Sequence, residues 1–256
     1  MSAGGSQFLW VDGFLEWLIG CRPMSPGCKN CPACEALARL GHPRGHVWHS
    51  TMAEWAKICK IKPHSLILAC ASSDMFIEEA EVWWADMHAQ ILSRPDVTFV
   101  VLTKRLANAK KFFERFGAPA NLWLGTSAED QKTLDERVPL LYSILTAGYI
   151  LSLQPLIAEV DVTPYLSEKK LQKVITGCEL GENARPCEGA WLDKIKAACK
   201  AHGVRCFVAR DRDKKGHIVR NITENGRRGP APWYNLRTDV PTIGEQMGIY
   251  KRLVVA

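Results

Sequence analysis

The sequence lacks several features that would assign it quickly to a class. It has no apolar run long enough to cross a bilayer, so no membrane association is expected. Its first residues carry no basic segment followed by an apolar one, so we expect no secretory signal and a cytoplasmic location. No G-x-G-x-x-G or G-x-x-x-x-G-K-[ST] stretch supports nucleotide binding by those routes. Repeats and low-complexity tracts are also absent.

Cysteine, in contrast, is abundant and clustered. The 256 residues include ten cysteines, four of them spaced Cys21-x6-Cys28-x2-Cys31-x2-Cys34. Thiols stay reduced in the cytosol, which argues against a disulfide framework. Zinc takes four thiolates in a closed site, and a [4Fe–4S] cluster also accepts four, whereas three would leave one iron open for another ligand. Cys34 is either that fourth ligand or a spare thiol on a following helix.

Apolar segments rich in β-branched residues alternate with amphipathic ones along most of the chain. This alternation predicts an α/β fold with a parallel sheet covered on both faces. A full or partial (β/α) TIM-like barrel fits best, and a doubly wound open sheet is the alternative. We expect the barrel over residues 1–209 and a loop-rich C-terminal extension over 210–256. The expected strands are 65–71, 97–103, 121–127, 148–154, 171–177 and 204–209, and the expected helices 78–93, 106–116, 129–145 and 191–203.

Polar residues follow every expected strand, where such folds carry their functional groups. Helix caps would explain Asp74 and Ser127 as well as a site would. The tandem Lys104–Arg105 is harder to explain in that way, because cations oppose a helix N-terminus. An anionic ligand would account for the pair. The candidate residues at the strand ends are Ser72, Asp74, Lys104, Arg105, Ser127, Gln154, Cys178 and Glu179.

Several blocks together resemble a family of phage and bacterial proteins described as radical S-adenosylmethionine (SAM)-like. The family has a tryptophan shortly before Gly-Cys and then S-P-G-C-x-x-C, as at Trp17, Gly20-Cys21 and residues 25–31 here. Further blocks follow in the family's order over roughly residues 10–210: ASSDMF (71–76), LTKR (102–105), NLWLGTSAED (121–130), LSLQPL (151–156) and TGCELGENARP (176–186). Departures from the family include Pro32 for a tyrosine, Gln154 for a glutamate and Cys178 for a glycine.

The resemblance implies a radical SAM barrel and assigns roles to the candidates. Cys21, Cys28 and Cys31 would hold a [4Fe–4S] cluster that an electron donor such as flavodoxin reduces. Lys104 or Arg105 would bind the SAM carboxylate. Ser72 and Asp74 would bind its ammonium or ribose, and Ser127 is a further candidate for binding the cofactor. Gln154, Glu179 and Ser127 would contact substrate, while Cys178 is either a hydrogen-atom donor or a small buried residue.

The same resemblance suggests DNA as the substrate. Related enzymes rearrange a side chain on a modified thymine, so we expect an isomerase or mutase acting on hypermodified thymidine in phage DNA, in the cytoplasm of a bacterial host. The net charge of +6 and the basic stretch from Arg205 to Arg228 suit a polyanion, although a solvated loop would look the same. Two alternatives remain: a zinc-stapled nucleic-acid-binding protein, and a radical SAM enzyme acting on a free nucleotide or another small molecule.

Overall fold

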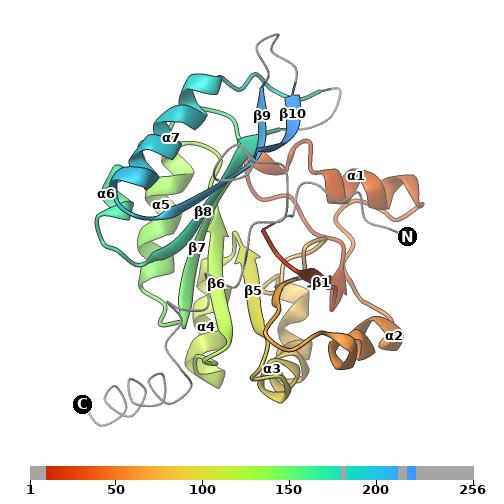
Figure 1. The fold of residues 1–256 in the computed structure, drawn as a ribbon. Helices are drawn as coiled ribbons and strands as arrows, with labels where there is room; N and C mark the ends of the chain where they lie inside the picture. The colour runs from red at the N-terminus through yellow and green to blue at the C-terminus, as the bar shows by residue number, and fades with distance from the viewer. Residues whose placement is uncertain (1–9, 180–182, 213–217, 223–256) are drawn as a thin grey trace.

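A curled, mostly parallel sheet forms the centre of the protein (Figure 1). The structure, a computed structural model, describes residues 10–179, 183–212 and 218–222. The sheet has eight strands in the order β1-β4-β5-β6-β7-β8-β9-β10, and all neighbours are parallel except β9 and β10. The strands are β1 (Gly13–Leu15), β4 (Leu66–Ala69), β5 (Thr98–Thr103), β6 (Leu122–Ser127), β7 (Gly148–Leu156), β8 (Leu171–Cys178), β9 (Arg205–Arg212) and β10 (Ile218–Ile222). A small second sheet pairs β2 (Leu18–Ile19) with β3 (Trp48–His49).

Helices connect the parallel strands and cover the convex face of the sheet (Figure 1). The helix expected from residue 129 begins later, at Gln131, because Asp130 caps it in a capping box with Thr133. The first part of the helix expected over 78–93 is a 3-10 turn, Glu78–Trp83. The α-helices are α1 (Pro32–Arg39), α2 (Met52–Trp55), α3 (Trp84–Ser93), α4 (Leu106–Phe116), α5 (Gln131–Tyr142), α6 (Thr163–Leu166) and α7 (Gly189–Ala201).

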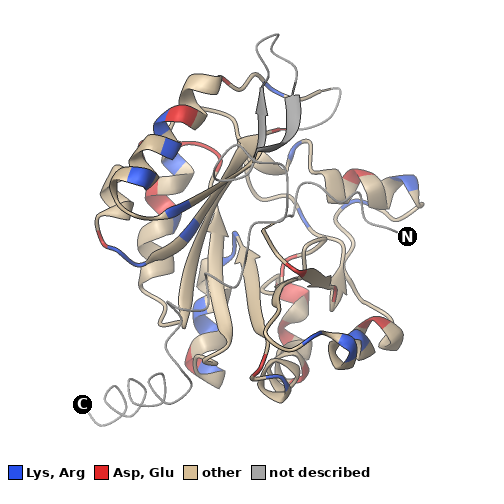
Figure 2. Ribbon diagram, in the orientation of Figure 1, with Lys and Arg blue, Asp and Glu red and all other residues tan. Residues whose placement is uncertain are grey.

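The two faces of the sheet belong to different apolar clusters because side chains alternate along each strand. On β4, Leu68 packs with Trp123 and Ile150 on the concave face. Its neighbours Ile67 and Ala69 pack against the helices on the convex face. Figure 2 shows that charged residues lie mainly on helices and loops, whereas the strands carry few. The concave face is therefore apolar along the strands, and its polar residues gather where the strands end.

The sheet continues past the expected boundary at residue 209. Strand β9 runs to Arg212 and pairs in antiparallel fashion with β10, while residues 223–256 of the expected extension lie outside the described part. In the order of described strands, β1 and β10 are the two edges, so the barrel is a partial one. None of the described helices is long and apolar enough to span a membrane.

Candidate functional site

The cysteine loop, defined here as residues 20–34, packs against the C-terminal end of the sheet. It follows β2 and includes the 3-10 turn Pro26–Cys28 and the start of α1. Its side chains and backbone contact residues that come at or just after the ends of β5, β6 and β8. The candidates from the strand ends and the cysteines, far apart in sequence, therefore form one region.

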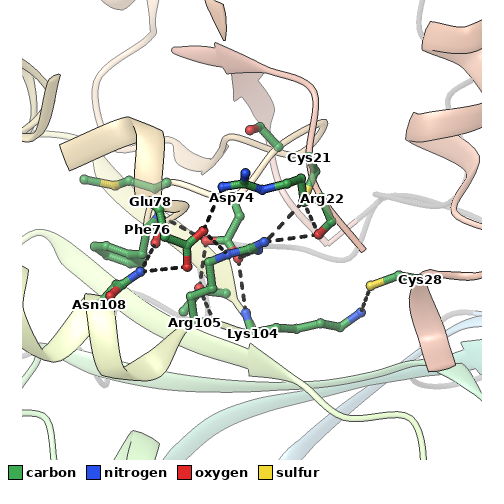
Figure 3. Close-up of polar contacts among 12 residues, drawn as sticks. Cys21, Arg22, Cys28, Asp74, Phe76, Glu78, Lys104, Arg105 and Asn108 are labelled. Carbon is green, nitrogen blue, oxygen red and sulfur yellow. Dashed lines mark hydrogen bonds and ion pairs between the residues drawn. The ribbon is translucent and has the colours of Figure 1, made fainter. Parts of the chain in front are cut away.

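Two cations approach two of the cysteine sulfurs (Figure 3). The Lys104 ammonium donates to Cys28 Sγ at 3.3 Å, and Arg105 Nη1 lies 3.9 Å from Cys21 Sγ. Arg105 also donates through Nη2 to the carbonyl of Arg22, at 3.1 Å. The tandem cations thus face the cysteine loop, at the position where α4 begins.

The thiols of the loop differ in acidity. Burial opposes ionisation of Cys28, but the Lys104 ammonium and hydrogen bonds within the loop outweigh it and lower the pKa of this thiol. A hydrogen bond from Cys34 lowers the pKa of Cys31 to about 6, and the same bond raises the pKa of Cys34. Burial raises the pKa of Cys21 to about 11, despite the opposing effect of Arg105. Cys28 and Cys31 are therefore the more readily ionised thiols.

Asp74 is the counterion that holds Arg105 in place. Its Oδ2 lies 3.2 Å from Arg105 Nη1, and both side chains are buried. Its Oδ1 accepts hydrogen bonds from Thr103 Oγ1 and from the Phe76 backbone, at 2.7 and 3.0 Å. Glu78 binds Arg105 Nε from the exposed side, at 3.3 Å. The carboxylate of Asp74 is thus engaged within the protein, and neither it nor Ser127 caps a helix.

Glu129 fixes the middle of the cysteine loop from the end of β6. The backbone N–H of Gly27 donates to Glu129 Oε1 at 3.1 Å, and Arg137 Nη1 donates to Oε2 at 2.9 Å. A Cβ at Gly27 would lie 3.0 Å from the Glu129 carboxyl carbon, so glycine allows this close approach. Glu129 is itself 1% exposed. It positions the turn that carries Cys28.

Glu179 fixes the loop from the end of β8. Asn30, between Cys28 and Cys31, donates to Glu179 Oε2 at 3.0 Å. Arg185 donates to both carboxylate oxygens, and its backbone and side-chain hydrogen bonds outweigh burial and lower the pKa of Glu179. The structure therefore shows Glu179, a candidate for substrate contact, engaged with Asn30 and Arg185.

Cys178, another candidate, forms a disulfide with Cys187 in this structure. The argument against disulfides has an exception at this pair, since β8 and the segment before α7 bring the two sulfurs together. A disulfide sulfur has no hydrogen atom to donate to a radical. The bond instead closes the segment that contains both Glu179 and Arg185.

Ser72 binds a carboxylate that the sequence did not reveal as a site residue. Its hydroxyl and backbone N–H donate to Glu16, at 2.9 and 3.2 Å. Burial raises the pKa of Glu16 to about 7, against the hydrogen bonds from Ser72. Glu16 follows β1, whose three residues give too short an apolar segment to predict a strand or its polar end.

The remaining candidates, Ser127 and Gln154, are half-buried at the ends of β6 and β7. Alternation from Trp123 and Ile150 places both on the concave face. Ser127 pairs in register with Ser152, and its carbonyl accepts from Arg137. The sequence did not indicate Asn30 or Arg137 as site residues. Nothing in the sequence marks them except that they lie in or beside the motifs.

The donors of the cysteine loop suit an iron–sulfur cluster by type. Thiolates are the usual cluster ligands, and adjacent cations favour the ionised form. Among the described residues, however, no three His, Cys, Asp or Glu side chains are gathered closely enough to hold a metal ion. Cys21, Cys28 and Cys31 share one loop, and the loop must draw their sulfurs together to hold a cluster. The residues fit the group in chemistry, with Lys104 and Arg105 offsetting its negative charge.

A family model described as "Protein of unknown function (DUF5131)" matches residues 5–227. The chain belongs to the DUF5131 family. No curated protein matches its sequence. The matched span includes the whole cysteine loop, all eight strands of the larger sheet and every strand-end candidate.

Solved structures of spore photoproduct lyase share the fold of this DUF5131 protein. A complex with a dinucleoside spore photoproduct has a TM-score of 0.50 and 11% identity, over 75% of this chain and 74% of that chain. A mutant with bound AdoMet and the dinucleoside spore photoproduct has a TM-score of 0.52 and 11% identity, over 76% and 75% of the two chains. A further mutant has a TM-score of 0.53 and 10% identity, over 81% and 78%. The predicted α/β fold, a partial (β/α) barrel, is confirmed, and spore photoproduct lyase has the same fold.

Proposed function

We propose that this protein is a radical SAM enzyme that acts on a DNA-related substrate. The observation that carries the proposal is the cysteine loop at the C-terminal end of a radical SAM-type partial barrel, with Lys104 at Cys28 and Arg105 at Cys21. When bound, a reduced [4Fe–4S] cluster supplies the electron that cleaves SAM to a 5′-deoxyadenosyl radical. The protein supplies ligands, position and shelter from water.

The cluster ligands in this proposal are Cys21, Cys28 and Cys31. Cys34 donates to Cys31 from the first turn of α1 and stays outside the ligand set. Three thiolates leave one iron open, which is what a SAM-binding cluster requires. An electron donor of the flavodoxin class would reduce the cluster, and the cytoplasm is the compartment in which such a cluster survives.

We propose Lys104 as the residue that binds the SAM carboxylate. Arg105 is already paired with Asp74 and Glu78, whereas the Lys104 ammonium contacts no carboxylate in the described part of the chain. An ammonium that contacts a thiol but no carboxylate can donate further hydrogen bonds to an anionic ligand. Ser127 and Gln154, half-buried on the concave face, are our candidates for substrate contacts.

The substrate we propose is a modified thymine in DNA, and the reaction an isomerisation. Two of the similar structures contain a dinucleoside photoproduct, which supports a substrate of this class. Because the sheet is open between β1 and β10, a base extruded from a strand could enter at the barrel mouth. A free nucleotide is the alternative, and dependence of turnover on polymer length separates the two.

Anaerobic purification followed by iron and sulfide analysis tests the enzyme class. We expect a brown protein with about four irons per chain, bleaching with dithionite and forming 5′-deoxyadenosine from SAM. Cys28→Ser should lose iron and product, while the control Cys59→Ser, at an exposed cysteine, should keep both. A colourless protein with one zinc per chain would instead support the zinc-stapled nucleic-acid-binding protein.

A further inference from the structure

The carboxylates around the cysteine loop differ in one respect: whether a cation pairs with them. Five of them are ion-paired through Arg22, Arg105, Arg137 or Arg185; these five are Asp74, Glu78, Glu79, Glu129 and Glu179. Glu16 is half-buried and forms no ion pair within the described residues, whereas Glu35, which also forms none there, is exposed on α1. The partners of the Glu16 carboxyl there are the hydroxyl and backbone N–H of Ser72 and the backbone of Ala71.

Glu16 faces the inside of the partial barrel. Leu15 and Trp17 belong to the convex cluster that packs on the helices, whereas Phe14 packs against the concave cluster. Alternation therefore sends the side chain of Glu16 to the concave face, immediately after β1 ends. It is half-buried, and burial without a cation is why its pKa lies so far above the ordinary value.

Three consecutive residues connect Glu16 to the cysteine loop. Ser72 donates to Glu16, and Ser73 Oγ donates to the carbonyl of Gly20, next to Cys21. Asp74 accepts from the backbone N–H of Lys104 at 3.3 Å and from the Arg105 guanidinium. One short segment, residues 72–74, therefore links Glu16, a carboxyl without a cation partner, to the backbone of Lys104, a cation without a carboxylate partner in the described residues.

From this arrangement we propose that Glu16 accepts a hydrogen bond from the amino group of the methionyl part of SAM. Glu16, which has no cation partner, and Lys104, which contacts the Cys28 thiol but no carboxylate, would match the amino group and the carboxylate of one α-amino acid. Asp74, which the sequence favoured for this role, is saturated by Arg105, Thr103 and Phe76. The inference rests on the proposed radical SAM function and adds a residue outside the blocks that suggested it.

The test compares two ligands that differ only in the amino group. S-adenosylhomocysteine has it, and the desamino analogue, which keeps the carboxylate and the adenosine, does not. Binding to the anaerobically reconstituted protein is measured by titration calorimetry, with no turnover required. Glu16→Gln should lower the affinity for S-adenosylhomocysteine by about 10- to 100-fold, which is the effect of losing one charge-assisted hydrogen bond. It should leave the desamino analogue unchanged.

Two further variants make the result specific. Glu54→Gln removes another partly buried carboxylate that interacts electrostatically with Glu16 but pairs with Lys57, so both affinities should stay at the wild-type level. Lys104→Met should lower the affinity for both ligands, because both have the carboxylate that Lys104 is proposed to bind. Iron content and circular dichroism confirm that each variant is folded and loaded.

Each other outcome overturns the inference in a distinguishable way. Equal weakening of both ligands by Glu16→Gln would mean that Glu16 supports the fold of the site and not the amino group. No weakening of either would mean that the amino group binds elsewhere, while the proposed function stands. Failure of the wild-type protein to bind either ligand would remove the proposed function and the inference together.

Discussion

Lys104 Nζ lies 3.3 Å from Cys28 Sγ, although 75 residues separate the two in the sequence. The contact brings a strand-end cation from β5 against a thiol of the cysteine loop. It also lowers the pKa of that thiol against the effect of burial. The same pairing of a cation with a sulfur recurs between Arg105 and Cys21, and the consequences of both can be measured.

The three-ligand arrangement predicts different effects for neighbouring cysteines. Cys31→Ser should lose most of the iron taken up on anaerobic reconstitution, because it removes a proposed ligand. Cys34→Ser should keep it, because Cys34 acts only as a hydrogen-bond donor to Cys31. Iron and sulfide assays on the two variants show which cysteine is a ligand. If Cys34→Ser lost iron and Cys31→Ser kept it, Cys34 and not Cys31 would be the third ligand.

Arg105→Gln should strongly destabilise the fold. It leaves Asp74 buried without its counterion, and the two side chains are 7% and 6% exposed. Breaking such a buried pair costs about 3–5 kcal/mol. Arg22→Gln is the matched control, since its pair with Glu78 is 45% and 59% exposed and should contribute about 0–1 kcal/mol. Urea unfolding measures both, and equal losses would contradict the role assigned to burial.

The stability of the protein should fall as the pH rises from about 4.5 to 7 through the contribution of Glu16. Burial raises the pKa of this group from its ordinary 4.5 to about 7, so the native state binds its proton more tightly than the unfolded state. The free energy of unfolding should drop across this window by at most about 3 kcal/mol.

Substitution isolates this contribution from those of other groups. Glu16→Gln cannot ionise, so its unfolding free energy should fall less between pH 5 and pH 8 than that of the wild type. Urea unfolding at the two pH values gives both slopes. A Glu16→Gln slope equal to the wild type would mean that Glu16 is ionised throughout.

Gly125→Ala should disturb the concave face of β6. A Cβ there would lie 2.5 Å from Leu102 Cδ2 and 2.7 Å from the Ile150 carbonyl oxygen, and the latter is backbone that cannot turn aside. We expect a loss of about 1–3 kcal/mol in unfolding free energy. Gly189→Ala, where a Cβ would meet nothing within 4 Å, should cost nothing. A thermal unfolding series checks the difference.

Thiol titration should find eight reactive cysteines in the denatured, metal-free protein and ten after reduction. Eight cysteines are free in the structure, and Cys178 and Cys187 form the disulfide. Ten thiols before reduction would show that the bond does not form in solution. Cys187→Ser should then give the same count with and without reductant, whereas the wild type changes.

The sheet strands could be predicted because each is a short, nearly continuous apolar segment bounded by polar residues. That pattern also located the strand ends and hence Lys104, Arg105 and Ser127. A further strand near the N-terminus could be anticipated but not placed, because the three residues of β1 give no periodicity, and Glu16 at its end was therefore not recognised. Partners could not be predicted either: Asp74 and Glu179 read as ligand contacts, but their arginine partners, Arg105 and Arg185, become apparent only when the chain is folded.

The anchors of the cysteine loop have a consequence for the order of events during synthesis. Gly27 and Asn30 are held by Glu129 and Glu179, which follow them by 102 and 149 residues. The loop therefore leaves the ribosome long before either partner exists. It can dock only after β8 has emerged and joined the sheet. Delivery of the proposed cluster to the docked loop would then follow translation of most of the chain, and a nascent chain stalled before residue 179 would present its thiols undocked.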